Sequence, residues 1–186
     1  MMKNRNKIIL GLLIFGAILF GVVQFVVIPH NNAEKQKYAI AQLEPTTQNL
    51  SEISDYKNSY MGNASNIINL FHHLPLADVN MNFEMFPKDF TVEVNYKDTV
   101  QNIGEEKVKK ALIYNSTASF ALIENLKYIV YNFPGTSYKV SRTDVEKLYD
   151  DFDNILKESN WKSKVQNKLI DKQYISQSAK KILVQQ

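Results

Sequence analysis

The sequence predicts an α+β domain that follows a single N-terminal transmembrane helix. An apolar stretch of membrane-spanning length lies near the N-terminus. Two pairs of segments have the alternation and the spacing of β-hairpins, and helical patterns precede, separate and follow them. Antiparallel hairpins with helices packed to one side are typical of the α+β class. The expected order after the membrane helix is α-ββ-α-ββ-α.

Residues 8–28 form an uninterrupted run without a formal charge, in which Gln24 is the one strongly polar side chain. At about 1.5 Å per residue, a helix of this length crosses a hydrocarbon layer of roughly 30 Å. Pro29 and the polar residues after it are expected to end the helix. We therefore predict a transmembrane signal-anchor over 8–28, which places the chain in the cell membrane as a single-pass protein.

The charges before this helix predict its orientation. Lys3, Arg5 and Lys7 precede it without an acidic residue among them. Positively charged flanks stay in the cytoplasm, so residues 1–7 are expected there and the rest of the chain is expected to be extracytoplasmic.

A cleaved signal peptide is the competing interpretation of the same segment. Its apolar core would be only about 7–15 residues long, which is shorter than the run found here. The best cleavage position, after Ala33, also has Asn31 where a small residue is needed. Retention of the helix as an anchor is favoured for both reasons.

The composition of the exported part excludes several classes of protein. Residues 30–186 hold 19 basic and 19 acidic residues, so this part is neutral and lacks the basic footprint of a nucleic-acid-binding protein. The chain has no cysteine. Disulfides, thiolate metal sites and cysteine-linked lipid are therefore excluded.

Residues 29–53 are predicted to be a linker with one helical stretch over 34–43, and the domain is predicted to span 54–161. Its first helix is expected after the turn at Gly62-Asn63, because apolar residues from Ile67 to Leu74 follow helical spacing. Pro75 is expected to end that helix.

The first hairpin is predicted to pair residues 81–86 with 91–96 across a loop at 87–90. If Phe86 opposes Thr91, every apolar residue of one strand faces an apolar residue of the other on one face. A shift by one residue would break all these pairs together, so the alternation specifies the register.

A long helix is predicted over residues 105–125. Glu105 and Glu106 lie in its first turn, where the helix dipole favours acidic residues. Residues 118–126 are apolar on nearly all sides, so we expect this helix to be the most buried element.

The second hairpin is predicted from residues 128–133 and the strand that returns after a Pro-Gly turn, with Phe133 opposite Thr136. Ser141 is expected to cap a third helix, whose apolar stripe extends to Leu156, with a break near Asp150-Asp151 as the alternative.

Residues 162–186 are predicted to be a basic C-terminal tail. From residue 157 onward, seven lysines accompany two acidic residues, a local charge of +5. Such a tail is expected to make weak contact with anionic lipid headgroups or wall polymers, or to be a solvated helix face. Residues 182–186 lack an evident packing partner and are expected to fray.

No cluster of residues predicts a catalytic or metal site. His72 and His73 are adjacent, so on a helix they point about 100° apart and cannot bind one metal ion together. The first hairpin places Glu84 opposite Glu93 on its polar face, where both carboxylates are expected to meet solvent. We therefore predict a non-enzymatic protein without a cofactor or a metal. An enzyme or a weak cation contact at these two glutamates is the remaining alternative.

Two groups of residues are predicted as a partner or ligand surface. They are Tyr60, Gly62 and Asn63 before the first helix, and Tyr128, Tyr131 and Tyr138 on the second hairpin, where with Asn132 they would line a binding groove. Tyrosine-rich surfaces favour recognition, although tyrosines in strands are more often sheet-packing residues.

Several short strings occur together in the order and spacing of a known family. They are Tyr60-x-Gly62-Asn63-x-Ser65, Leu74-Pro75, Phe120-Ala121-Leu122-Ile123 with Asn125, and Ser141-Arg142-x-Asp144-x-Glu146. Over residues 55–161 the chain resembles the bacterial domain-of-unknown-function family forty-eight twenty-five. The resemblance implies an extracytoplasmic domain of Gram-positive membrane proteins. It implies no activity, since that family has no assigned catalytic residues.

Two functions remain as hypotheses. The first is a membrane-anchored, non-enzymatic ligand- or partner-binding regulatory module, which would contact a membrane protein or an envelope ligand through its sheet face or the Gly62-Asn63 turn. The second is a structural or envelope-stress accessory protein, held against anionic lipid or wall polymer by its anchor and basic tail.

Overall fold

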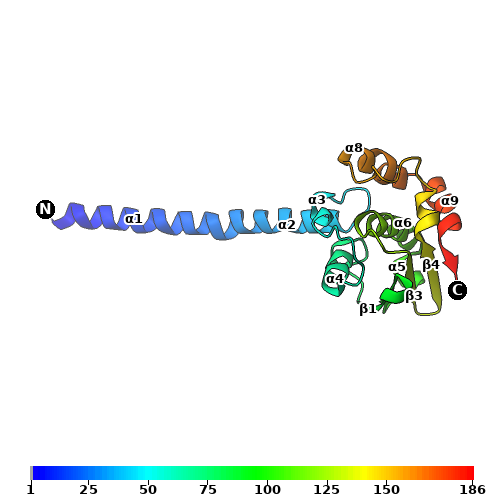
Figure 1. Ribbon diagram of the computed structural model, residues 1–186. Coiled ribbons are helices and arrows are strands. Elements are labelled where there is room, and N and C mark those ends of the chain that lie inside the picture. Colours follow the sequence, from blue (N-terminus) through cyan, green and yellow to red (C-terminus); the bar gives the residue numbers. More distant parts are fainter. Residues whose placement is uncertain (1) are drawn as a thin grey trace. The chain divides into compact units, whose positions relative to one another are not determined.

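The computed structural model describes residues 2–186. The chain divides into two compact units, one ending at Ile40 and the other running from Ala41 to Gln186. The first unit is helical, and the second combines helices with a β-sheet (Figure 1).

The first unit is built from a helix that continues without interruption through three segments. These are α1 (Met2–Val22), the π-helical turn η1 (Val23–Val27) and α2 (Ile28–Gln42). From Asn6 to Gln42 this helix is long and apolar enough to cross a membrane. The predicted apolar run over 8–28 lies within it.

The prediction that the helix ends at Pro29 is wrong, because α2 continues through this residue to Gln42. The π-helical turn directly before the proline provides the physical reason. There the Ile28 N–H donates to the Val23 carbonyl, a five-residue spacing that replaces the usual four. Such turns locally rearrange the hydrogen bonds that a proline would otherwise disrupt. The linker predicted over 29–53 is consequently helical in its first part.

The second unit contains a five-stranded sheet in the order β1-β2-β3-β4-β5. The strands are β1 (Met81–Phe86), β2 (Thr91–Tyr96), β3 (Tyr128–Phe133), β4 (Thr136–Ser141) and β5 (Val184–Gln185). Both predicted hairpin registers are confirmed, since Phe86 lies opposite Thr91 and Phe133 opposite Thr136. The α+β class is confirmed as well.

The two hairpins join into one sheet because β2 and β3 pair in parallel. A parallel pair needs a crossover connection, and here α5 (Val100–Ile103) and α6 (Glu105–Leu122) provide it. Every residue of α6 from 111 to 120 is buried, which confirms α6 as the central element. The helix ends at Leu122, whose carbonyl accepts a hydrogen bond from the Asn58 N–H.

The remaining helical segments are short. They are α3 (Ser51–Ser54), α4 (Ala64–His73), η2 (Pro87–Asp89), α7 (Arg142–Glu146), α8 (Glu158–Asn160), η3 (Trp161–Gln166), η4 (Lys168–Ile170) and α9 (Lys172–Ile182). The α4 helix begins as predicted, with the Asn63 side chain accepting from the Asn66 N–H. Ser141 caps α7 as predicted, but α7 ends at Glu146 and does not reach Leu156. The helix ends before the aspartates at 150, 151 and 153, whose low helix propensity disfavours a continuous helix as far as Leu156.

The expectation that residues 182–186 fray is wrong, and the segment predicted as a basic tail belongs to the packed unit. Five of its apolar residues lie in the hydrophobic core, together with Trp161 directly before it: Val165, Leu169, Ile175, Ala179 and Ile182. β5 also pairs with β4, antiparallel. The segment changes between π, 3₁₀ and α geometry, so its buried residues follow no single helical period.

Candidate functional site

Within residues 41–186, the helices cover one face of the sheet and leave the other uncovered. Along β2 the buried residues Val92, Val94 and Tyr96 alternate with half-buried neighbours that point the other way. We call the opposite side the open face. It consists of Asn82, Glu84, Phe86, Thr91, Glu93, Asn95, Tyr128, Val130, Asn132, Ser137, Lys139, Ser141 and Val184. Of these residues only Val130 is buried, and it lies outside the core cluster.

A row of amide side chains crosses the open face. The strand registers place Asn82 beside Asn95, Asn95 beside Asn132, and Asn132 beside Ser137. The Ser137 Oγ donates to Asn132 Oδ1 at 2.6 Å, and Asn132 Nδ2 donates to Asn95 Oδ1 at 2.7 Å. We call the three aligned amides Asn82, Asn95 and Asn132 the asparagine row.

The composition of this row works against the stability of the sheet. Asparagine is depleted in strands, because its side chain competes with the backbone for hydrogen bonds. Three asparagines nevertheless align on three adjacent strands. Positions at which a sequence contradicts its own local structure are expected at functional sites. The asparagine row is therefore the strongest candidate for a binding site in this domain.

Two carboxylates lie next to the asparagine row. Glu84 and Glu93 face each other across β1 and β2, as predicted. Asn95 Nδ2 lies 3.4 Å from Glu84 Oε1, and Asn132 Nδ2 lies 3.3 Å from Glu93 Oε2. Within residues 2–186 neither glutamate takes part in an ion pair. Both carboxylates accept hydrogen bonds from neutral amides, so the negative charge of Glu84 and Glu93 remains available to a ligand.

Two aromatic side chains flank the carboxylates on the open face. Phe86 is 39% exposed and Tyr128 is 36% exposed. Thr91 separates them, since it lies opposite Phe86 on one side and opposite Tyr128 on the other. The Lys139 ammonium lies 4.5 Å from the centre of the Tyr128 ring. The open face thus combines amides, acids and aromatic rings.

The three tyrosines predicted on the second hairpin do not form one groove. Tyr128 lies on the open face, whereas Tyr131 is fully buried with its hydroxyl 3.0 Å from Ser116 Oγ. Burial raises the pKa of Tyr131 well above its ordinary value. Tyr138 lies on the helix-covered side, where its ring centroid is 6.3 Å from that of Phe133. Tyr128 alone of the three contributes to the open face.

The other predicted group, Tyr60, Gly62 and Asn63, lies in the turn that leads into α4. Tyr60 is 56% exposed, and a Cβ added at Gly62 would lie 2.3 Å from the Tyr60 ring. Glycine therefore allows this ring to lie against the backbone. The helix that follows packs on the inner side of the sheet, because Phe71 lies 5.7 Å from Phe83 between ring centroids. This turn therefore belongs to the helical layer and not to the open face.

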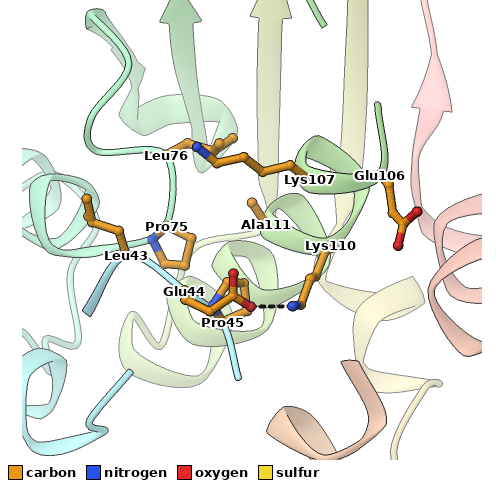
Figure 2. A pocket seen from close by; sticks show the side chains of 9 residues that line it. All are labelled: Leu43, Glu44, Pro45, Pro75, Leu76, Glu106, Lys107, Lys110 and Ala111. Carbon is orange, nitrogen blue, oxygen red and sulfur yellow. Dashed lines mark hydrogen bonds and ion pairs between the residues drawn. The ribbon is translucent and has the colours of Figure 1, made fainter. Parts of the chain in front are cut away.

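The domain also has a cavity of about 240 Å³ beside α6 (Figure 2). Its lining combines apolar residues (Leu43, Pro45, Pro75, Leu76 and Ala111) with charged ones (Glu44, Glu106, Lys107 and Lys110). Each charge already has a partner: Lys110 pairs with Glu44, Lys107 with Asp78, and Glu106 with Lys172. Burial acts to raise the pKa of Glu44, but the hydrogen bond and the charge of Lys110 outweigh it and lower that pKa. The cavity offers no unpaired charge to a ligand.

His72 and His73 make separate contacts within the domain. His73 Nδ1 lies 2.8 Å from the Asn69 carbonyl and 3.1 Å from the Tyr56 hydroxyl, while the His72 ring contacts Phe83. Over residues 2–186 no three histidine, aspartate or glutamate side chains are grouped as metal ligands would be.

These features define a class of protein. Its members have an α+β domain with one uncovered sheet face, in a chain that also has an N-terminal helix of membrane-spanning length. Residues 53–143 match the model of the family described as Domain of unknown function (DUF4825), which confirms the resemblance seen in the sequence. The match includes both hairpins and α6, and it ends before the C-terminal residues that complete the core. No curated protein and no solved structure gives a significant match to the chain.

Proposed function

We propose that this protein is a membrane-anchored, non-enzymatic binding module that presents its open face to a partner outside the cell membrane. The asparagine row carries the proposal, because it lowers the stability of the strands and lies on the sheet face that the helices of residues 41–186 leave uncovered. Binding to a partner outside the cell membrane would explain why the domain keeps a row of residues that lowers the stability of its sheet.

The N-terminal helix supports the membrane location. It is apolar and of spanning length, and Lys3, Arg5 and Lys7 lie at its N-terminal end. The tendency of basic flanks to remain in the cytoplasm favours an external domain.

The position of Glu84 and Glu93 supports a role without catalysis. A carboxyl group that acts as a general acid is normally desolvated, in a cleft that excludes water. Here Glu84 is exposed and Glu93 is half-buried on a sheet surface. Such carboxylates are suited to hydrogen bonding with a bound partner.

Site-specific photo-crosslinking in cells tests the proposal. A photoreactive amino acid replaces Glu84 on the open face or, as a matched control, Asn69 on the exposed side of α4. We expect the probe at Glu84 to give a discrete adduct that excess unlabelled protein suppresses, and the probe at Asn69 to give none. Equal labelling from both positions would contradict the open face as the binding surface.

A second candidate function rests on the lysines of the C-terminal helices. Lys162, Lys168, Lys172, Lys180 and Lys181 are all exposed, although the helices that carry them are packed into the domain. A surface of this kind would hold an envelope accessory protein against anionic lipid, with about 1 kcal/mol from each lysine near the membrane. Flotation with vesicles that contain phosphatidylglycerol tests it. Salt-sensitive binding that is lost when Lys180 and Lys181 become glutamine would favour this second function.

A further inference from the structure

We infer that the open face binds a neutral glycan strand, a polymer of linked sugar rings such as the cell envelope contains. This inference rests on the proposed function, because it names the class of partner for the same surface. It follows from three properties of the open face: its hydrogen-bonding groups, their spacing and its charge.

The hydrogen-bonding groups match those of sugars. An amide carries donors and an acceptor, and a sugar hydroxyl likewise donates and accepts. Both Nδ2 hydrogens of Asn132 are used within the face, but Asn95 keeps one Nδ2 hydrogen, and the oxygens of Asn95 and Asn132 each keep a lone pair for a ligand. Within the row, Asn132 and Asn95 are aligned by their mutual hydrogen bond and by Ser137, so their orientation is fixed before a ligand arrives. Asn82 continues the row at the exposed edge of the sheet. Pre-oriented groups reduce the entropy lost on binding.

The spacing of the row fits a polymer. Neighbouring strands lie about 4.8 Å apart, so the asparagine row presents one amide at each such step. This step is close to the length of one sugar unit in an extended β-linked glycan. A strand laid across β1, β2 and β3, at right angles to them, would meet one amide per sugar.

The charge of the open face selects against anionic partners. Glu84 and Glu93 lie beside the row without an ion pair among the residues described, and they would repel phosphate groups of nucleic acids, anionic lipids or phosphate-rich polymers. Carboxylates also accept strong, charge-assisted hydrogen bonds from hydroxyl groups. The exposed rings of Phe86 and Tyr128 offer apolar surface to the C–H side of a sugar ring.

A basic peptide is the main competitor for this surface, since the two acids would attract it. Lys139 weakens that alternative, because its ammonium lies over Tyr128 on the same face, where only Val130 separates Lys139 from Glu93 in the strand register. The two ligands also differ in their response to salt. Peptide binding would weaken steeply as ionic strength rises, whereas binding through neutral hydroxyl groups would change little.

Calorimetric titration of the full chain in nanodiscs of neutral lipid tests the inference, with the hexamer of N-acetylglucosamine as the probe. The test variant carries Asn95→Thr and Asn132→Thr, because threonine favours strands and keeps the sheet intact. Asn69→Thr on α4 makes the same chemical change away from the sheet. We expect saturable, salt-tolerant binding that the double variant weakens about tenfold or more and the control leaves unchanged.

Absence of saturable binding, or equal binding by the double variant, would overturn the glycan inference. If instead a lysine hexapeptide bound in a salt-sensitive way that Glu84→Gln weakened, the open face would remain a binding surface with a different partner. If the Glu84 crosslinking probe also gave no adduct in cells, the proposed function would fail together with the inference.

Discussion

Two buried serines on α6 differ in their hydrogen bonding although they are one turn apart. The Ser116 Oγ lies 3.0 Å from the Tyr131 hydroxyl. The Ser119 Oγ is buried without a hydrogen-bond partner among the described residues. Since a buried hydroxyl without a partner loses its hydration and gains nothing in return, the two serines should contribute to stability with opposite sign.

Ser119→Ala is therefore expected to raise the free energy of unfolding by about 1 kcal/mol, and Ser116→Ala to lower it by about 1 kcal/mol. Urea denaturation followed by circular dichroism measures both variants in parallel. A loss of stability in Ser119→Ala as large as that in Ser116→Ala would show that the Ser119 hydroxyl has a partner.

The ion pair between Glu44 and Lys110 predicts a dependence of stability on pH. Because the folded protein lowers the pKa of Glu44, its contribution is present above the ordinary glutamate value of 4.5 and disappears as the pH falls through the lowered value. Glu44 is 42% exposed, so we expect only about 0.5 kcal/mol from this pair. Glu44→Gln should reduce the free energy of unfolding by that amount at pH 7 and by less at pH 3. An equal effect at both pH values would contradict this assignment.

At the scale of elements, local patterns predicted the hairpins and failed where distant segments meet. In β1 and β2 the alternation and the short loop together specify the register, and the structure has that register. The parallel pairing of β2 with β3 depends on how α6 crosses the sheet, and no local pattern contains that information. The C-terminal helices were missed because three helix types follow one another within a few turns.

The sequence predicts only part of the candidate site, because local patterns specify the first hairpin but not the pairing of β2 with β3. The alternation in the first hairpin puts Asn82 beside Asn95 and Glu84 beside Glu93, so half of the open face is implied by one register. Asn132 joins them only through the parallel pairing of β2 with β3. Predicting the tyrosines as one surface failed because Tyr128 and Tyr131, three positions apart, point to opposite faces of the sheet.

The confirmed register predicts the effect of a charge change on this sheet. Glu84→Lys replaces a like-charge cross-strand pair by an opposite-charge pair with Glu93, and should stabilise the domain by about 0.5 kcal/mol at low salt. Glu84→Gln, which removes the repulsion only, should give a smaller gain. Thermal unfolding at low and high salt measures both variants, and a destabilised Glu84→Lys protein would contradict the proximity of the two side chains.

At the scale of the whole molecule, the C-terminal residues complete the domain. The indole N–H of Trp161 donates to the Tyr114 hydroxyl on α6 at 3.2 Å. The side-chain amide of Gln166 donates to the carbonyls of Pro45 and Gln48 at 3.1 and 2.8 Å. The C-terminal residues thus form hydrogen bonds with both the central helix α6 and the first residues of the domain.

A variant that ends at Asn160 is therefore expected to lose cooperative unfolding. It lacks six buried apolar residues worth about 10 kcal/mol or more, which is comparable with the whole stability of a domain at about 5–15 kcal/mol. A control that ends at Leu183 lacks only the short β5 strand and should keep a cooperative transition. Protease resistance and circular dichroism distinguish the two. A truncation at Asn160 with a transition near that of the full chain would show that the C-terminal segment is dispensable.

The central claim, that the open face is occupied outside the cell membrane, is tested most directly by cysteine labelling. The chain has no cysteine, so Asn82→Cys on the open face and Asn69→Cys on α4 each provide a single thiol. A membrane-impermeant maleimide is applied to intact cells and to purified protein. We expect both thiols to react in cells, with Asn82→Cys slowed several-fold relative to the purified protein and Asn69→Cys unchanged. Equal rates for Asn82→Cys in both settings, or no labelling of either thiol in intact cells, would contradict the claim.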